Sequence, residues 1–149
     1  MESNPLLELS GLPRFSLIRP SHIGPAIEKL LVENRRLIDQ LARPVIAATW
    51  TEFVAPLDDA SERLSRAWGT VGHLHGVLDS QELRDAYNEI QPKIVAYYTD
   101  LGQNQALFAK FKELRASAAF ANLTAAQRRV IVNELRDFKL SGAELTEAD

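Results

Sequence analysis

The segment from Ser61 to Leu101 constrains the fold of this chain more than any other. Its second half has apolar residues at steps of three and four, which a 3.6-residue period places on one helix face that has to be buried. These residues are Leu83, Ala86, Tyr87, Ile90, Ile94, Tyr97 and Leu101. Its first half supplies a partner stripe of Leu64, Trp68, Val71, His73, Leu74 and Leu78. The segment therefore predicts an antiparallel helical hairpin.

The second helix of this hairpin is predicted to run from Gln81 to about Gly102. The residues from Asp79 to Glu82 have the Asp-x-x-Glu spacing of a capping box, in which side chains satisfy the free amides of a first helical turn. Pro92 falls in the middle of the stripe, but the apolar spacing continues on both sides of it. We therefore expect one kinked helix and not two.

The first helix of the hairpin is predicted to begin near Trp50 and to run to about Leu78. It follows a second capping box of the Thr-x-x-Glu form, from Thr49 to Glu52. Pro56 falls early in this helix, where proline has no amide hydrogen to donate and crowds the carbonyl group four residues before it. A kink or a broken first turn is therefore expected near Pro56.

Residues 1–20 are predicted to form an extended leader, because three prolines favour extended backbone and turns. The leader has too many apolar side chains for a free tail, so we expect it to be ordered against the helices. These side chains are Leu6, Leu7, Leu9, Leu12, Phe15, Leu17 and Ile18. Ser21 is the predicted N-cap of the helix that follows, from about His22 to Ala42.

Two shorter helices are predicted in the last third of the chain. One runs from Asn104 to about Ala116, and a linker from Ser117 to Leu123 follows it. Thr124 to Gln127 is a third capping box and opens the other helix, for which Gly142 is the predicted C-cap. Residues 143–149 are predicted to be a polar, acidic tail with no apolar stripe to bury.

Together these elements predict an all-α fold, a multi-helix antiparallel array of about five helices that follows a Pro-rich extended leader. We expect one helical domain over residues 1–149, with the leader at 1–20, the helices at 21–142 and the tail at 143–149. A compact chain of this size buries roughly 70% of the surface that its unfolded form exposes, so a sizeable core is available.

Composition and charge exclude several classes of function. The net charge of −3 and the pI of about 5.6 give no concentrated basic surface, so we expect no nucleic-acid partner. The chain has no cysteine, which excludes disulfides and thiol chemistry and favours a cytoplasmic location. Its start, MESNPLLELSG, has neither a basic segment nor a long apolar run, so we expect no secretion signal and no membrane contact.

No catalytic, cofactor-binding or metal-ligating residue can be assigned. His73 and His75 are two residues apart on a predicted helix, which directs them about 200° apart, whereas a helical zinc pair needs a spacing of four. His22 stands alone at a helix start. The acidic pairs Asp58 with Asp59 and Glu147 with Asp149 are expected to be solvated, and no nucleophile motif or Gly-rich phosphate loop is present.

Two further groups of side chains are expected to be structural. The basic residues Arg128, Arg129, Arg136 and Lys139 alternate with Glu134 and Asp137, and a helix face of mixed sign is usually salt-bridged or solvated. The aromatic residues fall mostly on the apolar stripes and are expected in the core, with Tyr98 as the one that projects outward. They are Trp50, Phe53, Trp68, Tyr87, Tyr97, Tyr98, Phe108 and Phe111.

A set of short segments, in order and over almost the whole chain, carries a resemblance to a known family. The segments are Asn4–Leu7, Leu12–Ser16, Ile18–Ile23, Thr49–Trp50, Pro56–Leu57, His73–Leu74, Ser80–Arg84, Ala86–Tyr87, Pro92, Leu123–Gln127 and Asn133–Gly142. They resemble the N-terminal region of the thimet-oligopeptidase family of zinc metallopeptidases, in its bacterial oligopeptidase A branch. The resemblance implies a mostly helical fold around a deep channel that admits short peptides.

The resemblance also implies that catalysis takes place outside this sequence. The family holds zinc with a His-Glu-x-x-His helix and a downstream glutamate, all in a later part of its chain, and none of them maps here. We therefore expect an N-terminal part that forms a channel wall and is inactive alone, with a C-terminal catalytic portion as its partner and short peptides as substrates. Such a part should expose an apolar patch where the partner packs. The alternatives are a freestanding helical interaction module and a fragment that dimerises through the uncovered surface.

Overall fold

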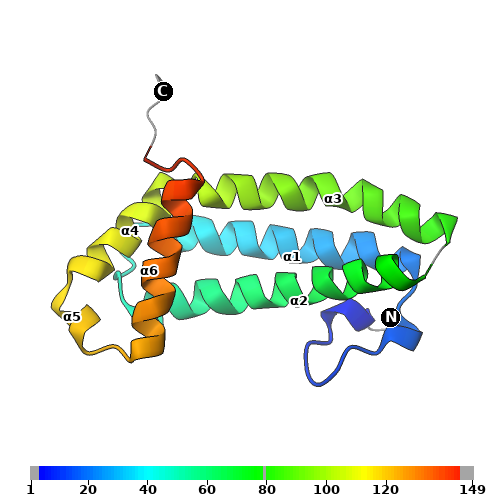
Figure 1. The fold of residues 1–149 in the computed structure, drawn as a ribbon, viewed down its shortest axis with the longest axis horizontal. Helices are drawn as coiled ribbons and strands as arrows, with labels where there is room; N and C mark the ends of the chain where they lie inside the picture. Colours follow the sequence, from blue (N-terminus) through cyan, green and yellow to red (C-terminus); the bar gives the residue numbers. More distant parts are fainter. Residues whose placement is uncertain (1–3, 79, 145–149) are drawn as a thin grey trace. The chain divides into compact units, whose positions relative to one another are not determined.

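The computed structural model of the chain describes residues 4–78 and 80–144, and most of these residues are helical (Figure 1). Six α-helices are found in these residues: α1 (Pro20–Leu41), α2 (Ala55–Val77), α3 (Gln81–Gly102), α4 (Gln105–Ala116), α5 (Ala118–Ala121) and α6 (Ala125–Leu140). Three single turns accompany them: the 3-10 turns η1 (Pro5–Leu7) and η2 (Phe15–Leu17) and the π-helical turn η3 (Trp50–Val54). The described residues contain no strand, and the predicted all-α fold is confirmed.

The chain divides into two compact units. The first unit comprises Met1–Arg36 and Asp59–Ala96, and the second comprises Leu37–Asp58 and Tyr97–Asp149. The helices α1, α2 and α3 each contribute to both units. That the whole chain folds as one domain stays a prediction.

In the first unit, α1, α2 and α3 lie side by side and alternate in direction (Figure 1). The hairpin of α2 and α3 is confirmed, and α3 has the predicted limits, with Pro92 inside one continuous helix. The buried apolar residues of this unit are Leu6, Ile23, Ala26, Ile27, Leu30, Leu31, Ala60, Leu64, Ala67, Val71, Leu74, Leu83, Ile90 and Ile94. Trp68, Ala86, Tyr87 and Leu101 of the predicted stripes are only half-buried, and two further members are exposed. Leu78 follows the last residue of α2, and His73 lies beside the leader.

The leader is ordered, as predicted, over its described residues. The side-chain oxygen of Asn4 accepts a hydrogen bond from the amide of Leu6, and its Nδ2 donates to the carbonyl oxygen of His22 at 2.8 Å. Leu6 is almost fully buried, whereas Leu12 and Leu17 remain exposed. The leader is thus extended only in part, because the 3-10 turns η1 and η2 interrupt it.

The helix α1 begins two residues before the predicted start, and the predicted N-cap role of Ser21 is wrong. Pro20 occupies the first turn, where a residue without an amide hydrogen costs nothing. The amide of Arg19 donates to Nδ1 of His22 at 3.1 Å, and the amide of His22 donates to the carbonyl oxygen of Arg19 at 2.9 Å. These two hydrogen bonds close the first turn of α1 in the manner of a capping box, with the imidazole of His22 in place of a carboxylate.

The irregular turn predicted near Pro56 is confirmed as the π-helical turn η3. Thr49 caps it by accepting a hydrogen bond from the amide of Glu52 at 3.1 Å. The amides of Val54 and Ala55 donate to carbonyl groups five residues earlier, those of Thr49 and Trp50. Because Pro56 has no amide hydrogen and its ring crowds the carbonyl group four residues before it, a wider turn there accommodates the start of α2.

The second unit is built on an aromatic core between η3, α4 and α6. The rings of Phe53 and Phe111 meet edge to face at 4.8 Å, and Phe138 lies 5.7 Å from both Phe108 and Phe111. Lys110 is also buried there, and its Nζ donates to the carbonyl oxygen of Ile46. The buried apolar residues of this unit are Ile38, Leu41, Ala48, Phe53, Val54, Leu57, Tyr97, Leu107, Phe108, Phe111, Leu114, Ile131, Phe138 and Ala143.

The ends of α6 follow the prediction closely. Thr124 and Gln127 form both hydrogen bonds of the predicted capping box. At the other end, the amides of Gly142 and Ala143 donate to the carbonyl oxygens of Lys139 and Phe138, which is a Schellman motif. Gly142 has a φ of 89°, a conformation that favours glycine.

Two predictions about the C-terminal third are wrong. The predicted linker contains a single-turn helix, α5, whose first residue follows Ser117. The predicted polar tail begins too early, because Ala143 is only 6% exposed and packs with the end of α6. The chain turns back after Gly142, so Ala143 points into the unit and not into solvent. The rest of the predicted tail, apart from Glu144, lies outside the described residues, as does Asp79 of the predicted capping box.

Candidate functional surfaces

The three histidines each have a structural neighbour. Nδ1 of His22 accepts a backbone amide hydrogen bond of 3.1 Å, the ring of His73 lies 5.2 Å from that of Phe15, and the ring of His75 stacks on Tyr87 at 4.1 Å. In the part of the chain that the structure describes, no group of three His, Asp or Glu residues is placed to hold a metal ion. The described residues therefore do not fit a zinc site.

The Tyr87 ring of α3 lies between two rings of α2. It stacks on Trp68 at 4.7 Å with 18° between the planes, and on His75 at 4.1 Å with 13°. Trp68 and His75 are two helical turns apart, about 10.5 Å along the axis, so one ring contacts each face of the tyrosine. This stack fixes the register of α2 against α3.

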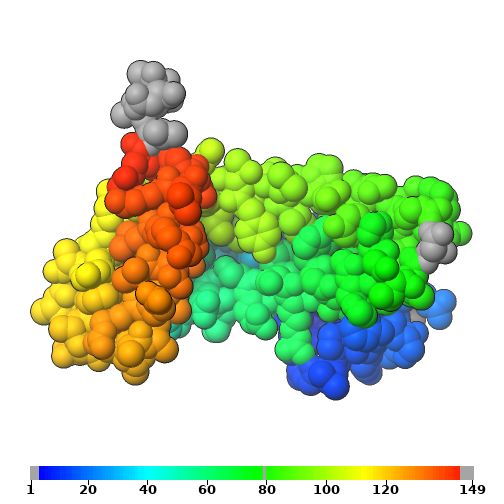
Figure 2. Space-filling view, in the orientation of Figure 1, coloured from blue at the N-terminus to red at the C-terminus, as the bar shows by residue number. Residues whose placement is uncertain are grey.

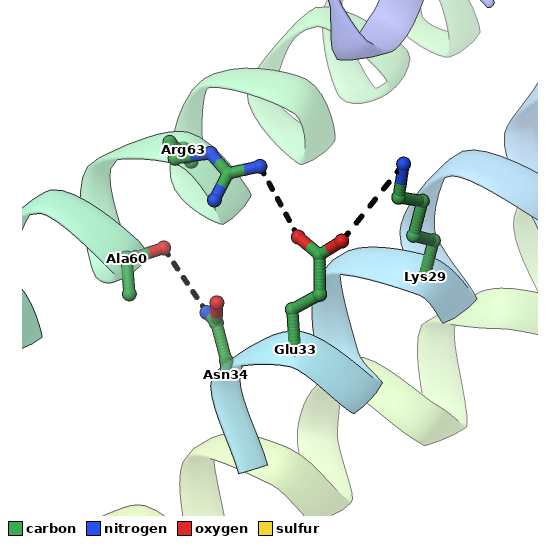
Figure 3. Close-up of polar contacts among 5 residues, drawn as sticks. All are labelled: Lys29, Glu33, Asn34, Ala60 and Arg63. Atoms are coloured by element: carbon green, nitrogen blue, oxygen red, sulfur yellow. Dashed lines mark hydrogen bonds and ion pairs between the residues drawn. The ribbon is translucent and has the colours of Figure 1, made fainter. Parts of the chain in front are cut away.

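Polar contacts tie α1 to α2 within the first unit (Figure 3). The carboxylate of Glu33 lies 3.8 Å from Nζ of Lys29 and 3.2 Å from the guanidinium of Arg63. Beside it, the buried Asn34 donates from Nδ2 to the carbonyl oxygen of Ala60 at 3.0 Å. The exposed ion pairs contribute little to stability, whereas a buried amide is costly to leave unpaired. Asn34 is therefore the polar contact that specifies this packing.

One carboxyl group has a perturbed titration. Burial raises the pKa of Glu134 on α6 above its ordinary value, and the nearby carboxylates of Asp137 and Asp58 raise the pKa further. A partly buried carboxylate among like charges is a common feature of catalytic sites. Here it is not accompanied by a nucleophile or a metal ligand set in the described residues, so we assign it no catalytic role.

Three of the four basic residues on α6 make local contacts and Arg129 is exposed, as the mixed charge pattern predicts. Arg128 donates from Nη1 to the carbonyl oxygens of Ala121 and Leu123 at 3.1 and 2.7 Å, which ties α6 to the preceding turn. Arg136 pairs with its neighbour Asp137 at 2.9 Å. Lys139 pairs with Glu144 at 3.1 Å.

Two open pockets of about 420 Å³ lie on the surface. One belongs to the first unit, between the N-terminal turns of α1 and α3, and its charged residues are all acidic: Glu28, Glu82, Asp85 and Glu89. The other belongs to the second unit, between α4 and α6. It is mostly apolar, and its lining residues are Arg115, Val132, Leu135, Arg136, Lys139 and Leu140.

The α6 pocket was not predicted from the sequence, although a signal for it is present. Val132, Leu135 and Leu140 recur at helical spacing, which marks a second apolar face beside the buried one of Ile131 and Phe138. Only the packing shows that this second face is left largely open within the described part of its unit.

The expectations for Tyr98 and for one of the two acidic pairs can be compared with the structure. Tyr98 is 41% exposed while Tyr97 is 2% exposed, so the predicted outward direction of Tyr98 is confirmed. Asp58 and Asp59 are exposed, as predicted for a solvated pair. Glu147 and Asp149 lie outside the described residues.

None of the helices within residues 4–78 and 80–144 is both long enough and apolar enough to cross a membrane. The 23-residue α2, for example, carries Asp58, Asp59 and Glu62 in its first half.

Three relatives are similar to this chain over nearly all of its length. Oligopeptidase A of Haemophilus influenzae is 47% identical over 146 residues, which are 97% of this chain and 21% of the relative. Oligopeptidase A of Escherichia coli is 37% identical over 96% of this chain and 21% of the relative. A probable cytosolic oligopeptidase A of Arabidopsis thaliana is 34% identical over 97% of this chain and 20% of the relative. The chain thus spans about a fifth of the length of these relatives.

The family model that matches the chain is described as the N-terminal domain of neurolysin and thimet oligopeptidase. It covers residues 27–149, which include the whole of the second unit and most of the first. The chain belongs to the neurolysin/thimet oligopeptidase family and corresponds to its N-terminal domain.

Proposed function

We propose that this chain is the N-terminal helical part of an oligopeptidase A that cleaves short peptides, and that it forms part of the wall of the substrate channel. The observation that carries the proposal is the similarity to oligopeptidase A over 97% of this chain and only 21% of the relative. On this proposal the remaining portion holds the catalytic residues, and the chain alone is not a peptidase.

The long helices support a role as a wall. A peptidase that selects its substrates by size needs rigid elements around the entrance, since the barrier must not open for folded proteins. The helices α1, α2 and α3 have 22, 23 and 22 residues, which corresponds to about 33 Å each. The ring stack on Tyr87 and the buried Asn34 hold these helices in register.

Zinc, in this proposal, is bound outside the chain. Each histidine here has a structural neighbour, and the described residues offer no set of three metal ligands. In a zinc peptidase the metal polarises the substrate carbonyl and activates water. The described residues of this chain would act only through shape, by admitting peptides and excluding larger substrates.

We further propose a cytoplasmic location. A cysteine-free sequence suits a reducing compartment, and one of the relatives is described as probably cytosolic.

Peptide hydrolysis by the full-length gene product tests the proposal. The substrate is a quenched fluorescent peptide of about ten residues, offered free and also embedded in a loop of a folded carrier protein. We expect cleavage of the free peptide only, loss of activity with a chelator and recovery with zinc, and no activity from residues 1–149 alone. A full-length product that leaves the free peptide intact contradicts the peptidase role. Equal cleavage of both substrates contradicts the wall role.

A further inference from the structure

The second apolar face of α6 forms an open groove with α4. Val132 and Leu140 are 40% and 80% exposed, and Leu135 is half-buried between them. The three residues follow helical spacing, so they form one continuous stripe along α6. In Figure 2, α6 is drawn in orange and lies at the surface beside α4. The groove has a volume of about 420 Å³ and is open to solvent. An exposed apolar surface of this kind often marks an interaction site.

The rim of this groove has one sign of charge. Its three charged lining residues are Arg115, Arg136 and Lys139. Arg115 lies over the ring of Phe120 at 4.3 Å, so its guanidinium is held beside the groove. The pairs that Arg136 and Lys139 form with neighbouring carboxylates are exposed, and such pairs exchange partners at little cost.

The charge of the rim decides between two occupants. A second copy of this chain would meet the groove through a two-fold axis, which brings the same surface of both copies together. The basic rim of one copy would then meet the basic rim of the other, and like charges in an interface oppose association. A segment with an apolar face and acidic flanks meets no such opposition.

The relatives are long enough to supply such a segment. The chain matches about a fifth of their length, so about four fifths of each relative lie outside the matched part.

We propose that the groove of Val132, Leu135 and Leu140 is the docking site for an amphipathic helix of the catalytic portion, with carboxylates on its flanks that pair with Arg115, Arg136 and Lys139. The inference rests on the proposed function, because it requires the longer protein. A helix that docks in an apolar groove buries one apolar face there, and the exposed apolar side chains of α6 offer such a surface.

Cysteine labelling in the full-length gene product tests the proposal. The chain has no cysteine of its own, so Leu140→Cys introduces one reporter into it. The rate of maleimide labelling at this position, read by mass of the peptide that contains it, is compared between native protein and the same protein in urea. We expect native labelling at least tenfold slower than in urea, although Leu140 is 80% exposed in this chain. Equal rates would overturn the proposal.

Two matched variants sharpen the result. Val45→Cys, at a site 82% exposed in the second unit and outside the groove, should be labelled at least fivefold faster than Leu140→Cys in the native protein. When combined with Leu140→Cys, Arg115→Glu should raise the native labelling rate at least threefold, and Arg115→Lys should leave it within twofold. If Arg115→Glu leaves the labelling rate of Leu140→Cys unchanged, the docked helix does not have the proposed carboxylates on its flanks.

Dilution and mass separate the other outcomes. Protection that falls as the protein is diluted would assign the groove to a second copy and overturn the proposal. A native gene product of 16.6 kDa would overturn the proposed function together with this inference. A longer product in which the thiol of Leu140→Cys is labelled as fast as in urea would overturn this inference alone.

Discussion

The imidazole of His75 lies flat on the ring of Tyr87, with 4.1 Å between the ring centroids and 13° between the planes. Trp68 covers the opposite face of Tyr87 at 4.7 Å. The stack joins α2 to α3 near their connecting turn, and it combines apolar burial with the favourable geometry of stacked rings.

Tyr87→Ala should lower the free energy of unfolding of the 149-residue chain by about 2–3 kcal/mol, because it empties the space between two rings. Tyr87→Phe keeps the stack and should change stability by less than about 1 kcal/mol. Urea unfolding followed by circular dichroism measures both. If the alanine variant were as stable as the phenylalanine variant, the stack would not hold the hairpin.

Asn34→Asp should lower stability by about 2 kcal/mol or more at pH 7, because the new carboxylate cannot donate to the carbonyl oxygen of Ala60 and is buried. The side chain keeps its size, so the loss measures the hydrogen bond and the buried charge. Lys29→Met removes an exposed ion pair of Glu33 on the same helix and should change stability by less than about 0.5 kcal/mol. Similar losses from the two variants would contradict the role assigned to Asn34.

Glu134→Gln should make the chain more stable than the original, and this difference in stability should grow as the pH rises. Burial raises the folded-state pKa of Glu134 above the ordinary value of 4.5, so its protonated form favours the fold. That contribution is complete below pH 4.5 and is lost as the pH rises through the raised pKa. The variant should therefore match the original chain near pH 4 and exceed it at pH 7 to 8.

Thermal unfolding at intervals from pH 4 to pH 8 measures this difference for Glu134→Gln. Glu113→Gln, at an exposed position on α4, is the matched control and should follow the original chain at every pH. A constant offset between the Glu134→Gln variant and the original chain over the whole range would contradict the raised pKa.

Two glycine substitutions should have effects of opposite sign. Gly142→Ala should cost about 1–2 kcal/mol, because Gly142 adopts a φ of 89° in the Schellman motif that ends α6. Gly69 lies in the interior of α2, and a Cβ added there has no neighbour within 4 Å. Gly69→Ala should add about 0.5–1 kcal/mol, since alanine favours helix. Urea unfolding measures both, and effects of the same sign would contradict the assigned conformations.

Much of the fold follows from local patterns in the sequence. The stripe from Leu83 to Leu101 predicts α3 to the residue, and Thr124 with Gln127 predicts the start of α6. These signals are local, because helical spacing and capping boxes involve residues within one or two turns. The family, too, can be recognised from residues, since the matching segments extend along the whole chain.

Other features depend on contacts that a local pattern does not contain. The start of α1 is set by the imidazole of His22, which replaces the predicted cap of Ser21. The burial of Ala143 depends on the turn at Gly142, which directs the chain back onto its unit. The groove on α6 becomes apparent only from the structure, in which Phe138 lies on the buried face of the helix and Val132 on an exposed one. Such features require the packing of several helices.

The intact mass of the native gene product tests most directly whether this chain is part of a peptidase. An antibody raised against residues 1–149 captures the protein from an extract of the source cells, and mass spectrometry gives its mass. The proposed function predicts a mass several times 16.6 kDa, since the chain spans about a fifth of its relatives. A mass of 16.6 kDa would contradict it and would make the chain a freestanding helical protein whose link to the peptidases is one of ancestry.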